Sequence, residues 1–384
     1  SAPEVWVMAS RGLEGVVVAE TRLSKIYGEQ GRLLYSGYEI EDLAENTTFE
    51  EVCHLLWHGS LPNRRQLEEL SSQMAKARAV EPELIQLLRM LPASTHPMAA
   101  LRTAASALAS FDPEAEDMSR EANLRKAVRI TAKLPTLTAA FDRLRNGKEP
   151  VAPREDLSHA ANFLYMLRGT EPDELETRII DAALILHAEH GMNASTFAAR
   201  VTVATLSDMH SGVTSAIGTL KGPLHGGANE RVMHMLQAIG SVENVDGWIR
   251  DALDRKERIM GFGHRVYRAL DPRAPILKRL AEELSSRGGN TKWLEISERI
   301  QAVMAEEMER RGKQIYPNVD FFSASVYYTL GIPMDMFTNV FACARAAGWT
   351  AHIIEQLDDN RLIRPKADYI GPEGLKVPPI DERA

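Results

Sequence analysis

The chain has 384 residues, of which 44% are hydrophobic and 26% are charged, and its formal net charge at pH 7 is −8. This length fits two domains, or one large domain with a smaller one inserted, and the composition is sufficient for a full hydrophobic core. The negative charge argues against nucleic acid as the main partner, because phosphate binding requires a positive surface. Anionic small molecules are not excluded, since a site can be locally basic on an acidic protein.

Cysteine content and hydropathy bear on the compartment. The two cysteines, Cys53 and Cys343, are too few for a disulfide framework or a zinc site, which favours a reducing environment. No charged-then-apolar leader opens the chain, and no uncharged run reaches the ~18 residues that a membrane span requires. We therefore expect a soluble, cytoplasmic protein without membrane contact.

Only the N-terminal segment predicts β-structure. GVVVAETRLSKIYGEQGRLLYSGY alternates around a turn at residues 28–31, which indicates a small hairpin or meander. From TTFEEVCHLLWHGSLP onward, apolar residues return at helical spacing, with breaks expected near 110–117, 145–156 and 285–292. The sequence therefore predicts an all-α, mainly helical protein with a small N-terminal β-hairpin.

One predicted helix begins near Thr170, where Thr170 and Asp173 can form a capping box with Pro172 in the first turn. Gly191 ends this helix, and continuing its apolar stripe by one turn reaches His190. The buried stripe is expected to contain Leu175, Ile179, Ala182, Ala183 and Leu186.

Two further helices follow along the chain. One is predicted from about Gly226 to Gly240, and the other follows Asp271 as N-cap, with Pro272 in its first turn. Their inward faces are expected to contain Val232, Met235, Leu236 and Ile239 in the first and Ile276, Leu277, Leu280 and Leu284 in the second.

His225 lies in KGPLHGGANE, where Pro223 stops one helix and two glycines precede the next. The positive end of a helix disfavours a second proton on a nearby imidazole. A neutral imidazole can donate a hydrogen bond to an enol or enolate oxygen. For an isolated HGG motif, a histidine that merely packs beside a turn is the simpler interpretation.

His264 follows a Gly-Phe-Gly turn in IMGFGHRVYRALDPRAP, close to several arginines. A histidine can donate to a ligand carbonyl while a guanidinium binds a carboxylate through two hydrogen bonds. For Arg265, a solvated surface position is the better interpretation. Arg273 lies in the first turn of a helix, where a cation is unfavourable unless an anion joins it.

HAEHGMN places His187 and His190 three residues apart at the predicted end of a helix. No carboxylate or cysteine completes a recognisable metal-binding set, and histidines are good residues for capping a helix C-terminus. We rank metal binding well below capping, and we rank hydrogen bonding of a ligand by His190 level with capping.

Asp320 in YPNVDFF and Arg345 in ARAAGW are the remaining candidates. Acids are common at helix N-termini, but among apolar neighbours the pKa of Asp320 would rise toward the range of a general base. Arg345 lies in a helix of alanines, glycine and aromatic residues, which predicts close helix packing. A buried arginine there must find an anion, and a bound carboxylate would satisfy it.

Six motifs occur together in one order and spacing: HAEHGMN, GPLHGGANE, GFGHRVYRALDPR, PNVD, ARAAGW and DNRLIRP. In this combination the chain resembles the citrate synthase family over nearly its whole length, and it is similar to the compact dimeric form of bacteria and archaea. The resemblance implies a two-domain citrate synthase-like fold. A large helical domain (residues 1–225 and 332–384) and a small one (residues 226–331) would close over the active site.

The resemblance also implies a reaction, the condensation of acetyl-CoA with oxaloacetate and water to give citrate and CoA. His225 would stabilise the enol of acetyl-CoA, Asp320 would remove the methyl proton, and His264 would polarise the oxaloacetate carbonyl. The oxaloacetate carboxylates would be held by His190, Arg273, Arg345 and the partner subunit's Arg364, and CoA phosphates would be met by Arg268 and Lys313. This implies an obligatory homodimer, with acetyl-CoA as a substrate and with neither a metal nor another cofactor.

Three alternatives stay open at this point. A 2-methylcitrate synthase has the same fold and groups but uses propionyl-CoA, and one methylene is worth only ~1 to 3 kcal/mol of discrimination. A catalytically silent helical dimer would have no need of His225, His264 and Asp320 together. A histidine-rich metalloenzyme would be inactivated by chelators, which we do not expect.

Overall fold

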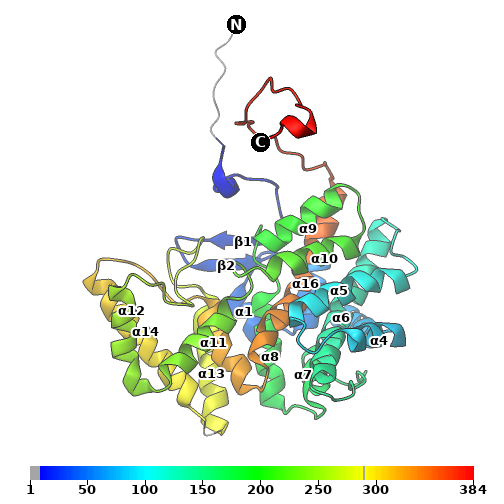
Figure 1. Cartoon of the computed structure of the whole chain (residues 1–384). Helices are drawn as coiled ribbons and strands as arrows, with labels where there is room; N and C mark the ends of the chain where they lie inside the picture. Colours follow the sequence, from blue (N-terminus) through cyan, green and yellow to red (C-terminus); the bar gives the residue numbers. More distant parts are fainter. Residues whose placement is uncertain (1–8, 289) are drawn as a thin grey trace.

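The computed structural model describes residues 9–288 and 290–384. Within them the predicted mainly helical fold and the N-terminal hairpin are confirmed (Figure 1). The strands are β1 (Ser24–Tyr27), β2 (Arg32–Tyr35) and β3 (Tyr38–Glu39). The α-helices are α1 (Ile40–Asn46), α2 (Phe49–His58), α3 (Arg64–Ala77), α4 (Pro82–Met90), α5 (Pro97–Leu108), α6 (Arg120–Arg145), α7 (His159–Arg168), α8 (Glu174–His187), α9 (Ala194–Ala204), α10 (Met209–Leu220), α11 (Ala228–Ile239), α12 (Val245–Asp254), α13 (Arg273–Gly288), α14 (Lys292–Arg310), α15 (Val319–Thr329) and α16 (Phe337–Asp358). Short 3₁₀ turns occur at Arg11–Leu13, Ala109–Phe111, Val242–Asn244, Met334–Met336 and Ile380–Glu382.

The small sheet is an antiparallel meander in the order β1-β2-β3, with Ser24 opposite Tyr35 and Tyr27 opposite Arg32. Its β1–β2 turn packs tightly against the segment that follows His264. A Cβ added to Gly28 would lie 2.3 Å from the backbone oxygen of Val266, so only glycine permits this approach. The hairpin therefore supports one of the candidate site segments.

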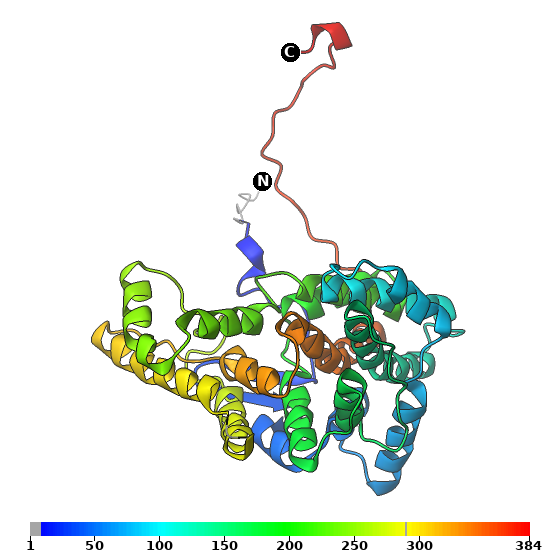
Figure 2. The ribbon, with the colours of Figure 1, turned by 60° about the horizontal axis from the view of Figure 1, so that its bottom comes forward.

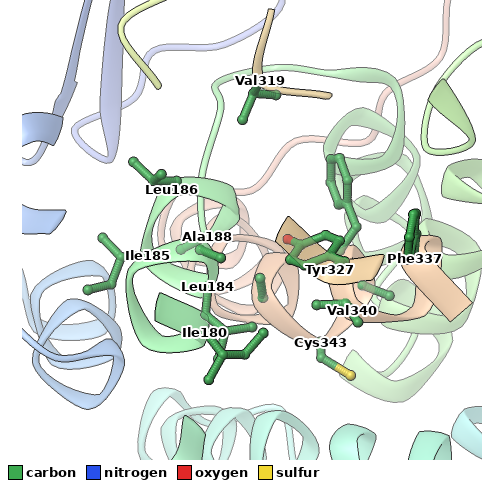
Figure 3. Close-up of a cluster of buried hydrophobic side chains, with 14 of the residues drawn as sticks. Ile180, Leu184, Ile185, Leu186, Ala188, Val319, Tyr327, Phe337, Val340 and Cys343 are labelled. Atoms are coloured by element: carbon green, nitrogen blue, oxygen red, sulfur yellow. The ribbon is translucent and has the colours of Figure 1, made fainter. Parts of the chain in front are cut away.

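Helix α16 runs through the middle of the molecule and packs against α2, α6, α8, α9 and α10 (Figure 1). Figure 3 shows part of the core between α8, α15 and α16. The labelled side chains are all buried: Ile180, Leu184, Ile185, Leu186, Ala188, Val319, Tyr327, Phe337, Val340 and Cys343. Because α8 and α16 are fixed by this core, the residues at their ends are fixed as well.

Helices α11, α12, α13 and α14 gather at one side of the molecule, and α4 to α7 lie at the other (Figure 1). After α16 the chain has no further α-helix and leaves the body as a long exposed segment (Figure 2). Two predicted breaks, near 110–117 and 145–156, are largely loops. The third predicted break, near 285–292, is partly wrong, because α13 continues to Gly288. Position 289 of this predicted break lies outside the described residues.

Several predicted helix ends also need correction. The N-cap of α8 is Asp173, which forms a capping box with Glu176, and Thr170 takes no part in it. Helix α11 begins at Ala228 and α13 at Arg273. The predicted inward faces of α11 and α13 are buried as expected, and so is that of α8 except for Leu175, which is half-buried.

Across the described residues, no helix combines the length and the apolarity that crossing a bilayer requires.

Candidate active site

His225 lies in the turn between α10 and α11 and is largely buried. Its Nε2 is 3.3 Å from the backbone nitrogen of Ser195 and 2.8 Å from the Ser195 Oγ. A backbone N–H can only donate, so Nε2 is an acceptor and the ring proton lies on Nδ1. Burial, and then the nearby charge of Arg345, lowers the pKa of His225 to about 4. The imidazole is therefore neutral, as predicted, and burial is the main cause.

The glycines after His225 do not both leave open space. A Cβ on Gly226 would lie 2.4 Å from the backbone oxygen of Leu220, so this glycine is required by packing within the chain. At Gly227 the nearest atom, the Cα of Pro223, is 4.0 Å away. At position 226 the space of the missing side chain is therefore filled by the chain itself, whereas at position 227 it is open.

Ser195 is a functional residue that sequence reasoning missed. Its Oγ receives a hydrogen bond from the indole Nε1 of Trp349 at 3.0 Å and lies 2.8 Å from the Oδ1 of Asn193. Asn193 is the N-cap of α9. In the sequence this segment shows only a helix-capping pattern. That pattern does not predict that Ser195 orients the ring of His225.

His264 is oriented by the backbone that follows it. The N–H groups of Val266 and Tyr267 donate to its Nδ1 at 3.0 and 3.2 Å, so its ring proton lies on Nε2. Burial and the charge of Arg273 lower the pKa of His264 to about 4. His264 is therefore the opposite tautomer to His225. Each ring is neutral, with one nitrogen accepting from the backbone and its N–H on the other nitrogen.

His190 lies beside His264, with ring centroids 5.4 Å apart, and its Nε2 is 3.1 Å from the Tyr267 hydroxyl. Burial, then the charge of Arg273, places the pKa of His190 well below its usual range. Contrary to expectation His190 is not part of a helix, because α8 ends at His187 and His190 occupies the bend before α9.

Arg273 is buried and has an anion of its own. Its Nε and Nη2 donate to the two carboxylate oxygens of Asp271 at 3.0 and 2.9 Å, and the side chains are 3% and 1% exposed. Burial opposes the cation, but Asp271 raises the pKa of Arg273. The anion that the sequence predicts beside this arginine is therefore present in the chain itself, as Asp271.

Asp320 occupies the first turn of α15, where Asn318 is the N-cap and accepts the Asp320 N–H at 3.0 Å. No described group donates a hydrogen bond to its carboxylate. Burial raises the pKa of Asp320 to about 6, against the opposing charges of Arg273 and Arg345. This carboxyl can take up and release a proton near neutral pH.

Arg345 is 1% exposed and donates from Nε to the backbone oxygen of His187 at 2.7 Å. No hydrogen bond from its Nη1 or Nη2 to another described residue is found. The helix approach here is very close, because a Cβ on Gly348 would lie 2.4 Å from the backbone oxygen of Ala188. Arg345 influences the pKa values of His225, His190 and Asp320, so it lies among the predicted groups.

Three predicted residues are not brought to this cluster. Arg364 is exposed in the C-terminal segment, and its bond to a described residue goes to the backbone oxygen of Pro365. Arg268 is exposed, with its N–H on the backbone oxygen of Gly28. Lys313 is exposed at the rim of a pocket of about 570 Å³ that is also lined by Phe262, Leu270, Gln301, Ala305, Met308, Glu309, Gly312, Gln314, Ile315, Tyr316 and Pro317.

His187 is the remaining histidine of the HAEHGMN motif, for which metal binding was considered. His187 is buried, and its Nδ1 is 2.7 Å from the backbone oxygen of Ala183. Within the described ranges, no three His, Cys, Asp or Glu side chains are placed to hold a metal ion.

Comparisons with known proteins find relatives that match nearly the whole chain. A family model described as "Citrate synthase, C-terminal domain" matches residues 12–366. Citrate synthase 2 of Bacillus subtilis (strain 168) is 56% identical over 377 residues, which cover 98% of this chain and 100% of that protein. The 2-methylcitrate synthase 1 of Corynebacterium glutamicum is 45% identical over 380 residues, covering 97% of this chain and 98% of its own.

A solved structure has the same fold as this chain. The ternary complex of Thermoplasma acidophilum citrate synthase with carboxymethyl coenzyme A and oxaloacetate superposes with a TM-score of 0.92 at 36% identity. The match covers 98% of this chain and 99% of that one. The fold described above is therefore shared along essentially the entire length of both proteins.

Proposed function

The chain belongs to the citrate synthase family, and from this premise we propose that it condenses acetyl-CoA with oxaloacetate and water to give citrate and CoA. The observation that carries the proposal is a pair of neutral histidines, His225 and His264, each with one nitrogen fixed by backbone N–H groups and one N–H free. Asp320, a carboxyl with a raised pKa, is within reach of the charges of Arg273 and Arg345, which also act on His264 and His225 respectively. Together they provide two hydrogen-bond donors and one base.

The first step is removal of a proton from the acetyl methyl group. This group is a poor acid, so a carboxylate base is insufficient unless the developing enolate oxygen receives a hydrogen bond at the same time. Asp320 accepts the proton, and the Nδ1–H of His225 donates to the thioester oxygen. The field of Arg345 reaches both side chains, which supports their action on one acyl group.

In the second step the enol carbon attacks the keto carbon of oxaloacetate. The Nε2–H of His264 polarises that carbonyl, while His190, Arg273 and Arg345 hold the carboxylates. The new carbon–carbon bond gives citryl-CoA, and water then cleaves its thioester to release citrate and CoA. Acetyl-CoA must be protected from the same water, so closure of a small domain (226–331) over a large one (1–225 and 332–384) is part of the proposal.

The active form is proposed to be a homodimer in which the partner subunit's Arg364 completes the oxaloacetate site. Charge balance supports this. Within one chain the cations Arg273 and Arg345 are already balanced by Asp271 and Glu189, so a ligand with two carboxylates calls for a further cation. Arg268 and Lys313 are proposed to bind the phosphates of coenzyme A.

The remaining features of the proposal are its compartment and its lack of a cofactor. Both cysteines are unpaired and buried, which supports the reducing cytoplasm as the compartment. Acetyl-CoA is a substrate, and the proposed mechanism uses neither a metal nor another cofactor.

A 2-methylcitrate synthase is the second candidate, because such a relative covers nearly the whole chain. Steady-state release of free thiol, with acetyl-CoA and propionyl-CoA compared side by side and oxaloacetate as acceptor, tests both. We expect a higher kcat/KM for acetyl-CoA, with citrate as the product. A preference for propionyl-CoA would assign the second function, and the absence of thiol release with either donor would reject both.

A further inference from the structure

The proposed oxaloacetate site contains a buried negative charge that the mechanism above does not use as a catalyst. Glu189 lies in the bend between α8 and α9, directly before His190, and its side chain is fully buried. A site for an anionic ligand would bind more tightly without such a group, because like charges repel. Its presence therefore needs a physical reason.

Three donors converge on one oxygen of Glu189. Its Oε2 accepts hydrogen bonds from the Ser24 Oγ at 2.5 Å, the Gly191 N–H at 3.0 Å and the His352 Nε2 at 2.8 Å. The direction of the last bond is fixed by Arg200, whose Nε–H donates to the His352 Nδ1 at 3.0 Å and leaves the ring proton on Nε2. Burial opposes the charge on Glu189, but these bonds and Arg345 hold its pKa below its usual range.

Glu189 balances Arg345 without binding it. Burial lowers the pKa of Arg345 to about 10, and Glu189 is the strongest of the groups that raise it. Yet no hydrogen bond joins the two side chains: the described bond of Arg345 goes to the backbone oxygen of His187. This differs from Arg273, whose Nε and Nη2 are both occupied by Asp271. Arg345 is therefore compensated from a distance and keeps its terminal nitrogens available for a ligand.

We propose that Glu189 is a positioning residue that limits the affinity of the oxaloacetate site for anions and so promotes release of the product. The inference rests on the proposed function of the site. Oxaloacetate carries two carboxylates and citrate three, and Coulomb repulsion grows with the charge of the ligand. Glu189 lies near Arg345, because Arg345 bonds to the backbone of His187 and a Cβ on Gly348, one turn further along α16, would lie 2.9 Å from the Glu189 Oε1. A fixed anion there weakens citrate binding more than oxaloacetate binding.

The variant Glu189→Gln removes the charge and keeps an oxygen for the three donors. We expect its Kd for oxaloacetate, measured by calorimetry on the intact enzyme without CoA, to fall about tenfold, since one neighbouring charge shifts ionic equilibria in proteins by about one to three powers of ten. The Kd for citrate should fall further, and citrate should become a stronger inhibitor. Glu189→Asp keeps the charge and should bind both ligands much as the wild type does.

Glu50→Gln is the matched control, because Glu50 is also a buried glutamate but its described contact is with the His159 backbone; its ligand affinities should not change. Unchanged or weaker binding in Glu189→Gln would overturn the inference, since a purely structural role predicts weaker binding. Glu189→Ser, which leaves room for water among the donors, should show the same tightening if Glu189→Gln does not fold. Failure of the wild type to bind oxaloacetate would instead count against the proposed function.

Discussion

The pKa of Asp320 links activity to pH in a way that can be measured directly. The general base must be ionised, and its pKa is raised to about 6. Activity is therefore present at pH 8 and lost as the pH falls through about 6, with about a tenth of the Asp320 side chains ionised at pH 5. His225 and His264 have pKa values of about 4, so they stay neutral over this range and add no second step.

The same shift has a consequence for stability. Folding raises the pKa of Asp320 from its ordinary 3.8 to about 6, so between these two pH values the carboxyl ionises in the unfolded state but not in the folded state. The folded state therefore loses stability as the pH rises from about 4 to about 6, and the full loss is present above about pH 6. The difference corresponds to roughly 3 kcal/mol at pH 8. Asp320→Asn should therefore abolish turnover and raise the free energy of unfolding at pH 8 by up to about this amount, with the gain shrinking toward pH 4.

The assay is kcat/KM for oxaloacetate from pH 5 to 9 by thiol release, together with urea unfolding of both proteins at pH 8 and pH 4. A single slope-one fall centred near pH 6 and a more stable, inactive variant are expected. A fall centred near pH 4, or an Asp320→Asn protein less stable than the wild type at pH 8, would refute the argument that a desolvated carboxyl is the base.

Three other outcomes follow from the geometry of the site. Ser195→Ala removes one of the two groups on the Nε2 of His225, so kcat should drop about tenfold with little change in the KM for oxaloacetate, as steady-state kinetics would reveal. Gly348→Ala places a methyl group against the backbone before α9 and should lower stability by about 1 to 3 kcal/mol in thermal unfolding; an unaffected Tm would contradict that contact. Arg364→Ala should be folded but inactive, and mixing it with Asp320→Asn under conditions of subunit exchange should restore thiol release, which would not happen if Arg364 served its own subunit.

The parts of the site that could be predicted from sequence depend on local rules. Asp320 follows the preference of acids for helix N-termini, and the buried faces of α11 and α13 follow from apolar periodicity, so their positions were predicted correctly. The raised pKa of Asp320 was also predictable, because the neighbouring residues in the chain are apolar.

The parts that could not be predicted depend on segments that meet only after folding. His225 and Ser195 are 30 residues apart, and nothing in either segment fixes which nitrogen of the ring is bound. Glu189 and His352 are 163 residues apart and meet only because α16 packs against the end of α8. Arg273 was expected to be joined by an anion, and Asp271, two residues earlier, supplies it by accepting hydrogen bonds from the Arg273 backbone and side chain.

The two glycines after His225 matter to anyone who wishes to re-engineer the enzyme for bulkier acyl groups. Substitutions at position 226 should prevent correct folding, because the backbone carbonyl of Leu220 already occupies the volume that a side chain would need there. Position 227 has no such obstruction, so new acyl selectivity should be sought at that residue first.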